Sequence, residues 1–206
     1  MPAEFIRIHP QNPEPRKIQQ VVNSLREGGV VIYPTDTVYA MGCDIHNARA
    51  VERIARIKGI KPQKNDFSFI CFDLSHIADY AKVGNNAFKV MKRLLPGPFT
   101  FILEANNRVP KVLANRRTVG IRVPDHPITR QIVFELDHPI ITTSIKDYDD
   151  DIMEYPNDPE VIFERFQHQV DIVIDGGLGG LIPSTVIDAT DDDFEIVRQG
   201  VGVFEI

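Results

Sequence analysis

The stretch KIQQVVNSLREGGVVIYPTDT, residues 17–37, decides the fold of this chain. In its first half, apolar residues recur at the spacing of one helix face, at Ile18, Val21, Val22 and Leu25. Gly28 and Gly29 then end the helix, and the continuous apolar run of residues 30–33 is typical of a buried strand. A helix that leads through a glycine turn into a buried strand predicts an α/β fold.

The rest of the chain continues this alternation of strands and helices. Ile6 and Ile8 alternate with polar residues in a short first strand, and Asn47 caps a helix that follows it. The further expected strands are residues 67–72, 99–103, 118–123, 140–143, 172–175, 184–187 and 195–198. The further expected helices are residues 75–81, 86–95, 128–136 and 158–166. We therefore predict a single α/β domain over residues 1–206, with one twisted, open, mixed sheet flanked by helices.

The composition excludes several classes of protein. The 206 residues are 43% apolar and 25% charged, which is usual for a globular domain and unlike a disordered or collagen-like chain. Two cysteines, Cys43 and Cys71, cannot build a disulfide framework for a domain of this size and are expected to be reduced thiols. Apolar runs fall short of the roughly 18 residues of a membrane span, and residues 1–7 lack the apolar core of a signal peptide. We expect a soluble, cytoplasmic protein with no membrane partner.

Charge is divided unevenly along the chain. Lysine and arginine against aspartate and glutamate number 4 and 5 in residues 1–48, 16 and 6 in residues 49–130, and 3 and 18 in residues 131–206. The net charges of these segments are therefore −1, +10 and −15. The basic middle segment predicts a cleft or surface for the phosphates of a nucleotide or a nucleic acid. The alternative is that the basic and acidic segments neutralise each other across the fold.

Several well-known motifs are absent from the sequence. It contains neither a P-loop nor the dinucleotide-binding G-x-G-x-x-G, and no G-x-S-x-G of a serine hydrolase. The six histidines show no metal-ligand spacing, so no dedicated metal site is expected. A glycine cluster, residues 176–180, has two interpretations: its backbone N–H groups bind an anion, or it is a turn between two strands.

Polar residues stand at the ends of three expected buried strands, where open α/β sheets bind ligands. They are Thr35-Asp36-Thr37, Thr142-Thr143-Ser144 and Ser184-Thr185. Two cations accompany them, because Arg122 lies within an apolar strand and Lys58 falls on the apolar face of the helix after Asn47. Singly, each residue is also explained as a polar contact of the core. Together they predict a site where hydroxyls orient a small zwitterion and cations hold its carboxylate and a neighbouring phosphate.

Longer motifs extend this pattern almost from end to end. They are YPTDTVY at residues 33–39 with Gly42, IKG at 57–59, PGPFT at 96–100, TVGIRVPDHP at 118–127, DGG at 175–177, PSTVID at 183–188 and VRQG at 197–200. In this order they resemble the YrdC-like family. The resemblance implies an open α/β fold with a deep basic cleft, and the synthesis of threonylcarbamoyl-AMP for the tRNA modification threonylcarbamoyladenosine.

The resemblance also implies substrates and residue roles. The substrates would be L-threonine, bicarbonate and ATP, with Mg²⁺ bound through the nucleotide phosphates, and pyrophosphate would be released. Threonine would be held by Thr35, Arg122, Thr142 and Ser184. The nucleotide would be bound by Lys58, Lys61, Thr118, Ser144 and Arg198, and of these Lys58 and Ser144 would be catalytic.

Two signatures of the family's active synthases differ in this chain. Their K-x-R corresponds to Lys58-Gly59-Ile60, followed by Lys61, and their S-x-N corresponds to Ser144-Ile145-Lys146. A lysine does not reproduce the planar, bidentate clamp of an arginine. These departures resemble the YciO branch, which implies either a weak or altered adenylate synthesis or binding of double-stranded RNA or tRNA along the basic cleft. A further alternative is another nucleotide-dependent reaction, and the acidic residues 147–159 are expected to form a lid.

Overall fold

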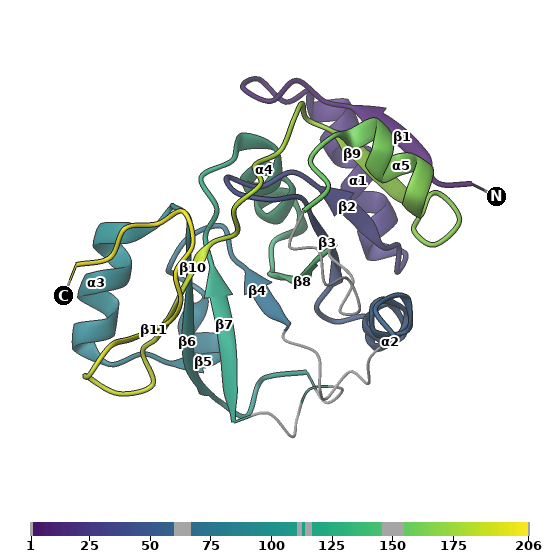
Figure 1. Cartoon of the computed structure of the whole chain (residues 1–206). Coiled ribbons are helices and arrows are strands. Elements are labelled where there is room, and N and C mark those ends of the chain that lie inside the picture. Colours follow the sequence, from purple (N-terminus) through teal and green to yellow (C-terminus); the bar gives the residue numbers. More distant parts are fainter. Residues whose placement is uncertain (1, 60–66, 111–112, 114–116, 146–154, 206) are drawn as a thin grey trace.

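One mixed sheet runs through the molecule (Figure 1). The computed structural model describes residues 2–59, 67–110, 113, 117–145 and 155–205. Within them the strands follow the order β1-β9-β2-β3-β8-β4-β7-β6-β10-β11, and β5 pairs with β6. The strands are β1 (Glu4–Arg7), β2 (Val31–Tyr33), β3 (Ala40–Asp44), β4 (Ser68–Ile70), β5 (Ala81–Lys82), β6 (Phe99–Ala105), β7 (Thr118–Arg122), β8 (Ile140–Ser144), β9 (Ile172–Asp175), β10 (Thr185–Asp188) and β11 (Glu195–Arg198). The sheet contains both parallel pairs, such as β1–β9, and antiparallel pairs, such as β3–β8, so the prediction of a mixed open sheet is confirmed.

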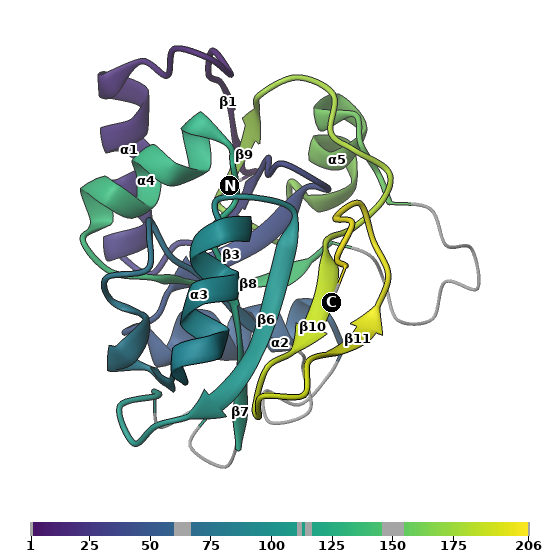
Figure 2. The same ribbon diagram turned by 90° about the vertical axis from the view of Figure 1, so that its left-hand side faces the viewer.

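Helices pack against this sheet and build two apolar clusters. They are α1 (Pro15–Arg26), α2 (Ala48–Ile57), α3 (Asn85–Leu94), α4 (Pro127–Leu136) and α5 (Pro159–Phe166). Figure 2 shows α1 and α4 side by side, and their apolar residues form one cluster with Val31 and Tyr33. The apolar residues of α2, α3 and α5 join the other cluster, around Phe69, Phe101 and Ile121. Among the described residues, no helix has the length and apolar character needed to cross a membrane.

The predicted helix boundaries are explained by local chemistry. The four apolar positions predicted for the first helix are all buried on α1, and Gly28 follows the helix with a φ of 89°, which glycine adopts without strain. Asn47 caps α2 as predicted, since its side chain accepts the N–H of Ala50 at 3.0 Å.

Two elements differ from the prediction. The strand β3 was not predicted, because its sequence AMGCD is rich in small residues and all five positions are buried, so no alternation marks it. The prediction of a helix over residues 75–81 is wrong. Only the 3₁₀ turn Ile77–Asp79 forms there, because the next residues are drawn into β5, where Ala81 pairs with Ala105 of β6.

Gly42 shows why a small residue is required in β3. A Cβ atom on Gly42 would lie 2.6 Å from Ile140 Cγ2, 2.7 Å from the backbone oxygen of Ile141 and 2.9 Å from the Tyr33 hydroxyl. The backbone oxygen cannot turn away as a side chain can. We therefore expect Gly42→Ala to lower the free energy of unfolding by about 1–3 kcal/mol.

Urea denaturation of the variant beside Gly84→Ala measures this effect. Gly84 meets nothing closer than 3.9 Å, so an added methyl group clashes with nothing, and as the N-cap of α3 its replacement is expected to cost at most about 1 kcal/mol. Equal midpoints for the two variants would contradict the close packing of β3 against β8.

Candidate functional site

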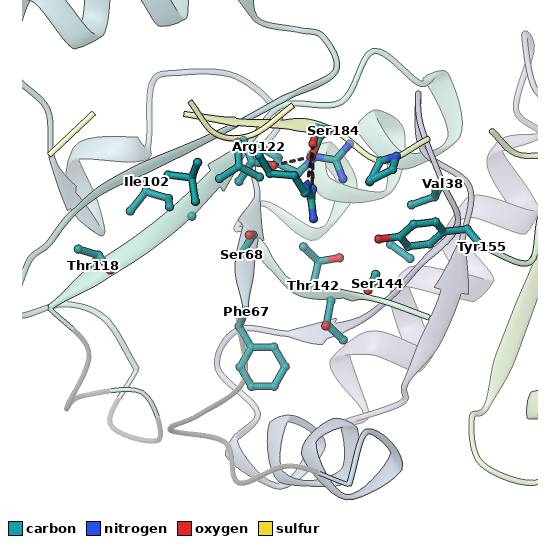
Figure 3. A pocket seen from close by; sticks show the side chains of 18 residues that line it. Val38, Phe67, Ser68, Ile102, Thr118, Arg122, Thr142, Ser144, Tyr155 and Ser184 are labelled. Atoms are coloured by element: carbon teal, nitrogen blue, oxygen red, sulfur yellow. Dashed lines mark hydrogen bonds between the residues drawn. The ribbon is translucent and has the colours of Figure 1, made fainter. Parts of the chain in front are cut away.

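A cavity of about 560 Å³ lies over the centre of the sheet (Figure 3). The side chains that line it alternate along the strands with residues of the core. On β7, Thr118, Gly120 and Arg122 line the cavity, whereas Val119 and Ile121 belong to the larger apolar cluster. Among the described lining residues there are two arginines and no carboxylate. This lining favours an anionic ligand.

Arg122 is the buried cation of the cavity. Its Nη2 atom donates to Asp36 Oδ1 at 3.0 Å and to Thr37 Oγ1 at 3.2 Å. Asp36 is fixed in turn, because its Oδ2 accepts the N–H of Asp125 at 3.1 Å. The Arg122 Nε atom is buried and finds no partner among the described residues. Burial lowers the pKa of Arg122, and the negative charge of Asp36 opposes that effect. An arginine remains protonated in either case.

Ser184 and Arg198 bring a second cation to the same cavity. Ser184 precedes β10, and its backbone oxygen accepts from Arg198 Nη2 at 2.8 Å and from Nε at 3.3 Å. The Ser184 hydroxyl lies 2.8 Å from the Thr100 hydroxyl on β6. The charge of Arg198 also contributes to the lowered pKa of Arg122, so the two guanidinium groups are in electrostatic contact. An anion bound between them would relieve that repulsion.

The hydroxyl of Thr142 is held as a donor toward the cavity. Tyr33 donates to Thr142 Oγ1 at 2.6 Å, so the oxygen of Thr142 already accepts one hydrogen bond. Among the described residues, the only acceptor for the Thr142 hydroxyl proton is the backbone oxygen of Met41, at 3.4 Å. Such a long bond is readily exchanged for one to a ligand oxygen. Burial raises the pKa of Tyr33, which keeps that hydroxyl protonated and donating.

Lys58 and Ser144 lie together at the end of α2 and of β8. The Lys58 side chain is buried, as its place on the apolar helix face predicted, and its Nζ donates to the backbone oxygen of Ser144 at 2.9 Å. Ser144 lines the cavity. The structure therefore joins two residues that are 86 positions apart in the sequence.

The remaining predicted ligand contacts are placed differently. Thr118 lines the cavity, but Thr35 lies in a neighbouring groove with Asp36 and His126. The Thr35 hydroxyl donates to the backbone oxygen of Val38 at 2.7 Å and accepts the N–H of Thr37 at 3.1 Å, so it supports the turn that carries Asp36 to Arg122.

Other predictions fall outside the described residues. Lys61 is one of them, as are Ile60 and Lys146 of the two altered signatures. Of the expected acidic lid, only residues 155–159 are described.

The glycine cluster forms a turn whose N–H groups bond within the protein. Gly176 donates to the Tyr39 hydroxyl at 3.1 Å, Gly177 to Asp175 Oδ1 at 3.0 Å, Gly179 to the Asn157 backbone oxygen at 2.8 Å and Gly180 to the Thr37 backbone oxygen at 2.7 Å. These four donors are therefore not directed at an anion. The turn interpretation is the correct one for these glycines, and the cluster instead supports the turn that contains Thr37.

Sequence reasoning missed two residues of the site. Asp36 was noted only as one of three polar residues, and its pairing with Arg122 spans 86 positions. Tyr155 lines the cavity, and Figure 3 shows its ring directed inward beside Val38. It lies within the acidic segment 147–159 and belongs to none of the quoted motifs, so no motif marked it as a residue of the cavity.

The cysteines have the character of core residues. Cys43 and Cys71 are both buried free thiols. Burial raises the pKa of the Cys71 thiol to about 12 and also raises that of Cys43, so neither is a thiolate near neutral pH. Within the described part of the chain, no group of three or more metal-ligating side chains comes together.

Comparison with known proteins gives one consistent result. The family model Sua5_yciO_yrdC, described as "Telomere recombination", matches residues 23–200. The protein YciO of Escherichia coli K12 is 44% identical over 202 residues, which make up 97% of each chain. The crystal structure of E. coli YciO has a TM-score of 0.90 at 43% identity and covers 98% of this chain and 97% of that one.

Two further relatives carry functional names. A putative threonylcarbamoyl-AMP synthase of Methanocaldococcus jannaschii is 33% identical over 202 residues, covering 96% of this chain and 93% of its own. The crystal structure of P. abyssi Sua5 complexed with L-threonine has a TM-score of 0.87 at 30% identity. That similarity covers 96% of this chain and 58% of the Sua5 chain.

Proposed function

Because the chain belongs to the Sua5, YciO and YrdC family, we propose that it is a weak or altered L-threonylcarbamoyladenylate synthase. It would use L-threonine, bicarbonate and ATP, release pyrophosphate, and supply a product for the threonylcarbamoyladenosine of tRNA. Curated relatives named as threonylcarbamoyl-AMP synthases, and the L-threonine complex of P. abyssi Sua5, support this proposal.

The observation that carries the proposal is the buried guanidinium of Arg122. Two N–H groups on Nη2 bind Asp36 and Thr37, and the buried Nε is left without a partner among the described residues. A buried arginine with an unused donor, in a cavity whose described lining residues include no carboxylate, is suited to a ligand carboxylate. The Thr142 hydroxyl, which can donate to a ligand oxygen, and Ser184 complete the proposed threonine site. Thr35 contributes by supporting the turn, since its hydroxyl is already engaged.

The proposed nucleotide site is formed by Lys58, Lys61, Thr118, Ser144 and Arg198. Lys58 and Arg198 would balance the charge of the phosphates, and the hydroxyls of Ser144 and Thr118 would orient the nucleotide. Mg²⁺ would enter with ATP as part of the substrate, held by the phosphates, because the cavity lining described here offers no carboxylate.

The proposed reaction needs positioning and charge balance from the protein. Bicarbonate takes up a proton and loses water to give carbon dioxide. The threonine amine then takes up the carbon dioxide and loses a proton, which gives a carbamate. A carbamate oxygen then forms a bond to the α-phosphorus of ATP while the bond from that phosphorus to the bridging oxygen breaks, and pyrophosphate leaves. Negative charge grows on the phosphate oxygens in this step, so cations fixed near them, such as Lys58 and Arg198, lower the barrier.

Pyrophosphate release tests the function directly. Purified protein is supplied with ATP, Mg²⁺ and bicarbonate, with or without L-threonine, and Lys58→Ala serves as the control for contaminating enzyme. We expect release that requires threonine and falls at least about 100-fold in Lys58→Ala, as when one stabilising donor is removed. Release that is equal with and without threonine, or equal in the two proteins, would argue against the synthase.

Binding of double-stranded RNA or tRNA is the second candidate function. It is favoured by the +10 charge of residues 49–130 and by the exposed Lys89, Lys92 and Arg93 on α3. Such binding depends on phosphate contacts and would weaken steeply with salt. If RNA binds, the dissociation constant is expected to rise at least about tenfold between 50 and 200 mM salt, as measured by fluorescence anisotropy. An affinity independent of salt would remove this candidate.

A further inference from the structure

One corner of the cavity is formed by residues that have no role in the proposed sites. These residues are Val38, Ala40 and Tyr155, and all three line the cavity. Figure 3 shows the Tyr155 ring next to Val38, with its hydroxyl pointing into the cavity. The Tyr155 side chain is half-buried, and its hydroxyl forms no hydrogen bond to the described residues. The corner thus offers two small apolar groups and one unused hydroxyl.

This corner adjoins the cationic part of the cavity. Val38 directly follows Thr37, whose hydroxyl accepts from Arg122 at 3.2 Å. Ala40 pairs with Ser144 across β3 and β8, two residues along the strand from the pair of Gly42 and Thr142. A small ligand whose carboxylate binds Arg122 therefore has the corner within reach of its side chain.

We propose that Tyr155 determines the amino-acid specificity of the site by hydrogen bonding to the side-chain hydroxyl of bound L-threonine. Val38 and Ala40 contact the methyl group of the same side chain. This inference rests on the proposed function, and it goes further by assigning the residue that distinguishes threonine from its isosteres. A site built to bind a ligand hydroxyl rejects an analogue without one, because its own polar group then loses a partner.

Three amino acids separate the two contacts in a calorimetric titration of the whole chain. L-Valine replaces the threonine hydroxyl with a methyl group, and L-serine lacks the methyl. For the unaltered protein we expect L-threonine to bind at least about tenfold more tightly than either. In Tyr155→Phe, which keeps the ring, threonine affinity should fall about tenfold while valine affinity stays within about twofold, so that the preference for threonine over valine is lost.

Tyr80→Phe is the matched control. It removes the same group from a tyrosine that packs edge-to-face against Phe69 and does not line the cavity, so it should leave all three affinities unchanged. Equal losses for threonine and valine in Tyr155→Phe would show a structural role and overturn the assignment, as would unchanged threonine binding. If the unaltered protein binds none of the three amino acids, the proposed function itself fails, and the assignment fails with it.

Discussion

Arg122→Met is expected to weaken L-threonine binding by about 100-fold, which corresponds to about 2.7 kcal/mol. The variant removes every charged donor that the cavity offers from β7, at a position that is 7% exposed. It also leaves Asp36 without its cation, at a side chain that is only 10% exposed. Removing one partner of a buried ion pair costs about 3–5 kcal/mol, so the free energy of unfolding should fall by a similar amount.

Two further variants separate binding from stability. Arg122→Met combined with Asp36→Asn no longer buries an unpaired charge, so it should recover much of the lost stability in urea denaturation while still failing to bind threonine. The matched control is Arg108→Met, because the Arg108–Asp79 pair is also short, at 2.6 Å, but its side chains are 69% and 44% exposed. That variant should lose at most about 1 kcal/mol. Full threonine affinity in the double variant would exclude Arg122 as the carboxylate ligand.

The fold was predictable wherever one strand or helix carries its own pattern. The helix α1 shows its buried face at three- and four-residue spacing, and β2 shows a continuous apolar run. Sequence patterns failed where pairing with a distant strand decides the structure. The small residues of β3 become a central strand only because β2 and β8 bind them on both sides, and the short β5 depends on β6. Tertiary contacts of this kind leave no local periodicity.

The candidate site was predictable to the same degree. Arg122 was conspicuous as a cation within an apolar strand, and Ser184, which directly precedes β10, belongs to one of the polar segments noted at the strand ends. The pairing of Arg122 with Asp36, and the position of Tyr155, depend on how distant segments meet. Thr35 was predicted as a threonine ligand because it lies in a polar motif, but its hydroxyl donates to the Val38 backbone oxygen within the turn.

The hydrogen bond from Lys58 to Ser144 connects the two altered signatures. Lys58 begins one of them and Ser144 begins the other, and Lys58 Nζ lies 2.9 Å from the Ser144 backbone oxygen. Each signature then departs from that of the active synthases at its third residue, Ile60 in one and Lys146 in the other. Two departures that follow one shared contact are expected to affect the same substrate, the nucleotide, and so their effects should not be independent.

Ile60→Arg together with Lys146→Asn is therefore expected to raise threonine-dependent pyrophosphate release by at least about 100-fold, since each restored group is worth about tenfold or more in a charge-stabilising site. Arginine returns a planar, bidentate donor for phosphate, and asparagine replaces a point charge by a neutral donor and acceptor. Initial rates of the single and double variants measure the gain. If the two sites are coupled, the gain of the double variant exceeds the product of the two single gains.

The same double change in a protein that also carries Lys58→Ala should give no gain, because the contact that links the signatures is then lost. If the double variant releases pyrophosphate no faster than the unaltered chain, the limit on synthesis lies elsewhere in the cavity, and the two signatures do not explain it.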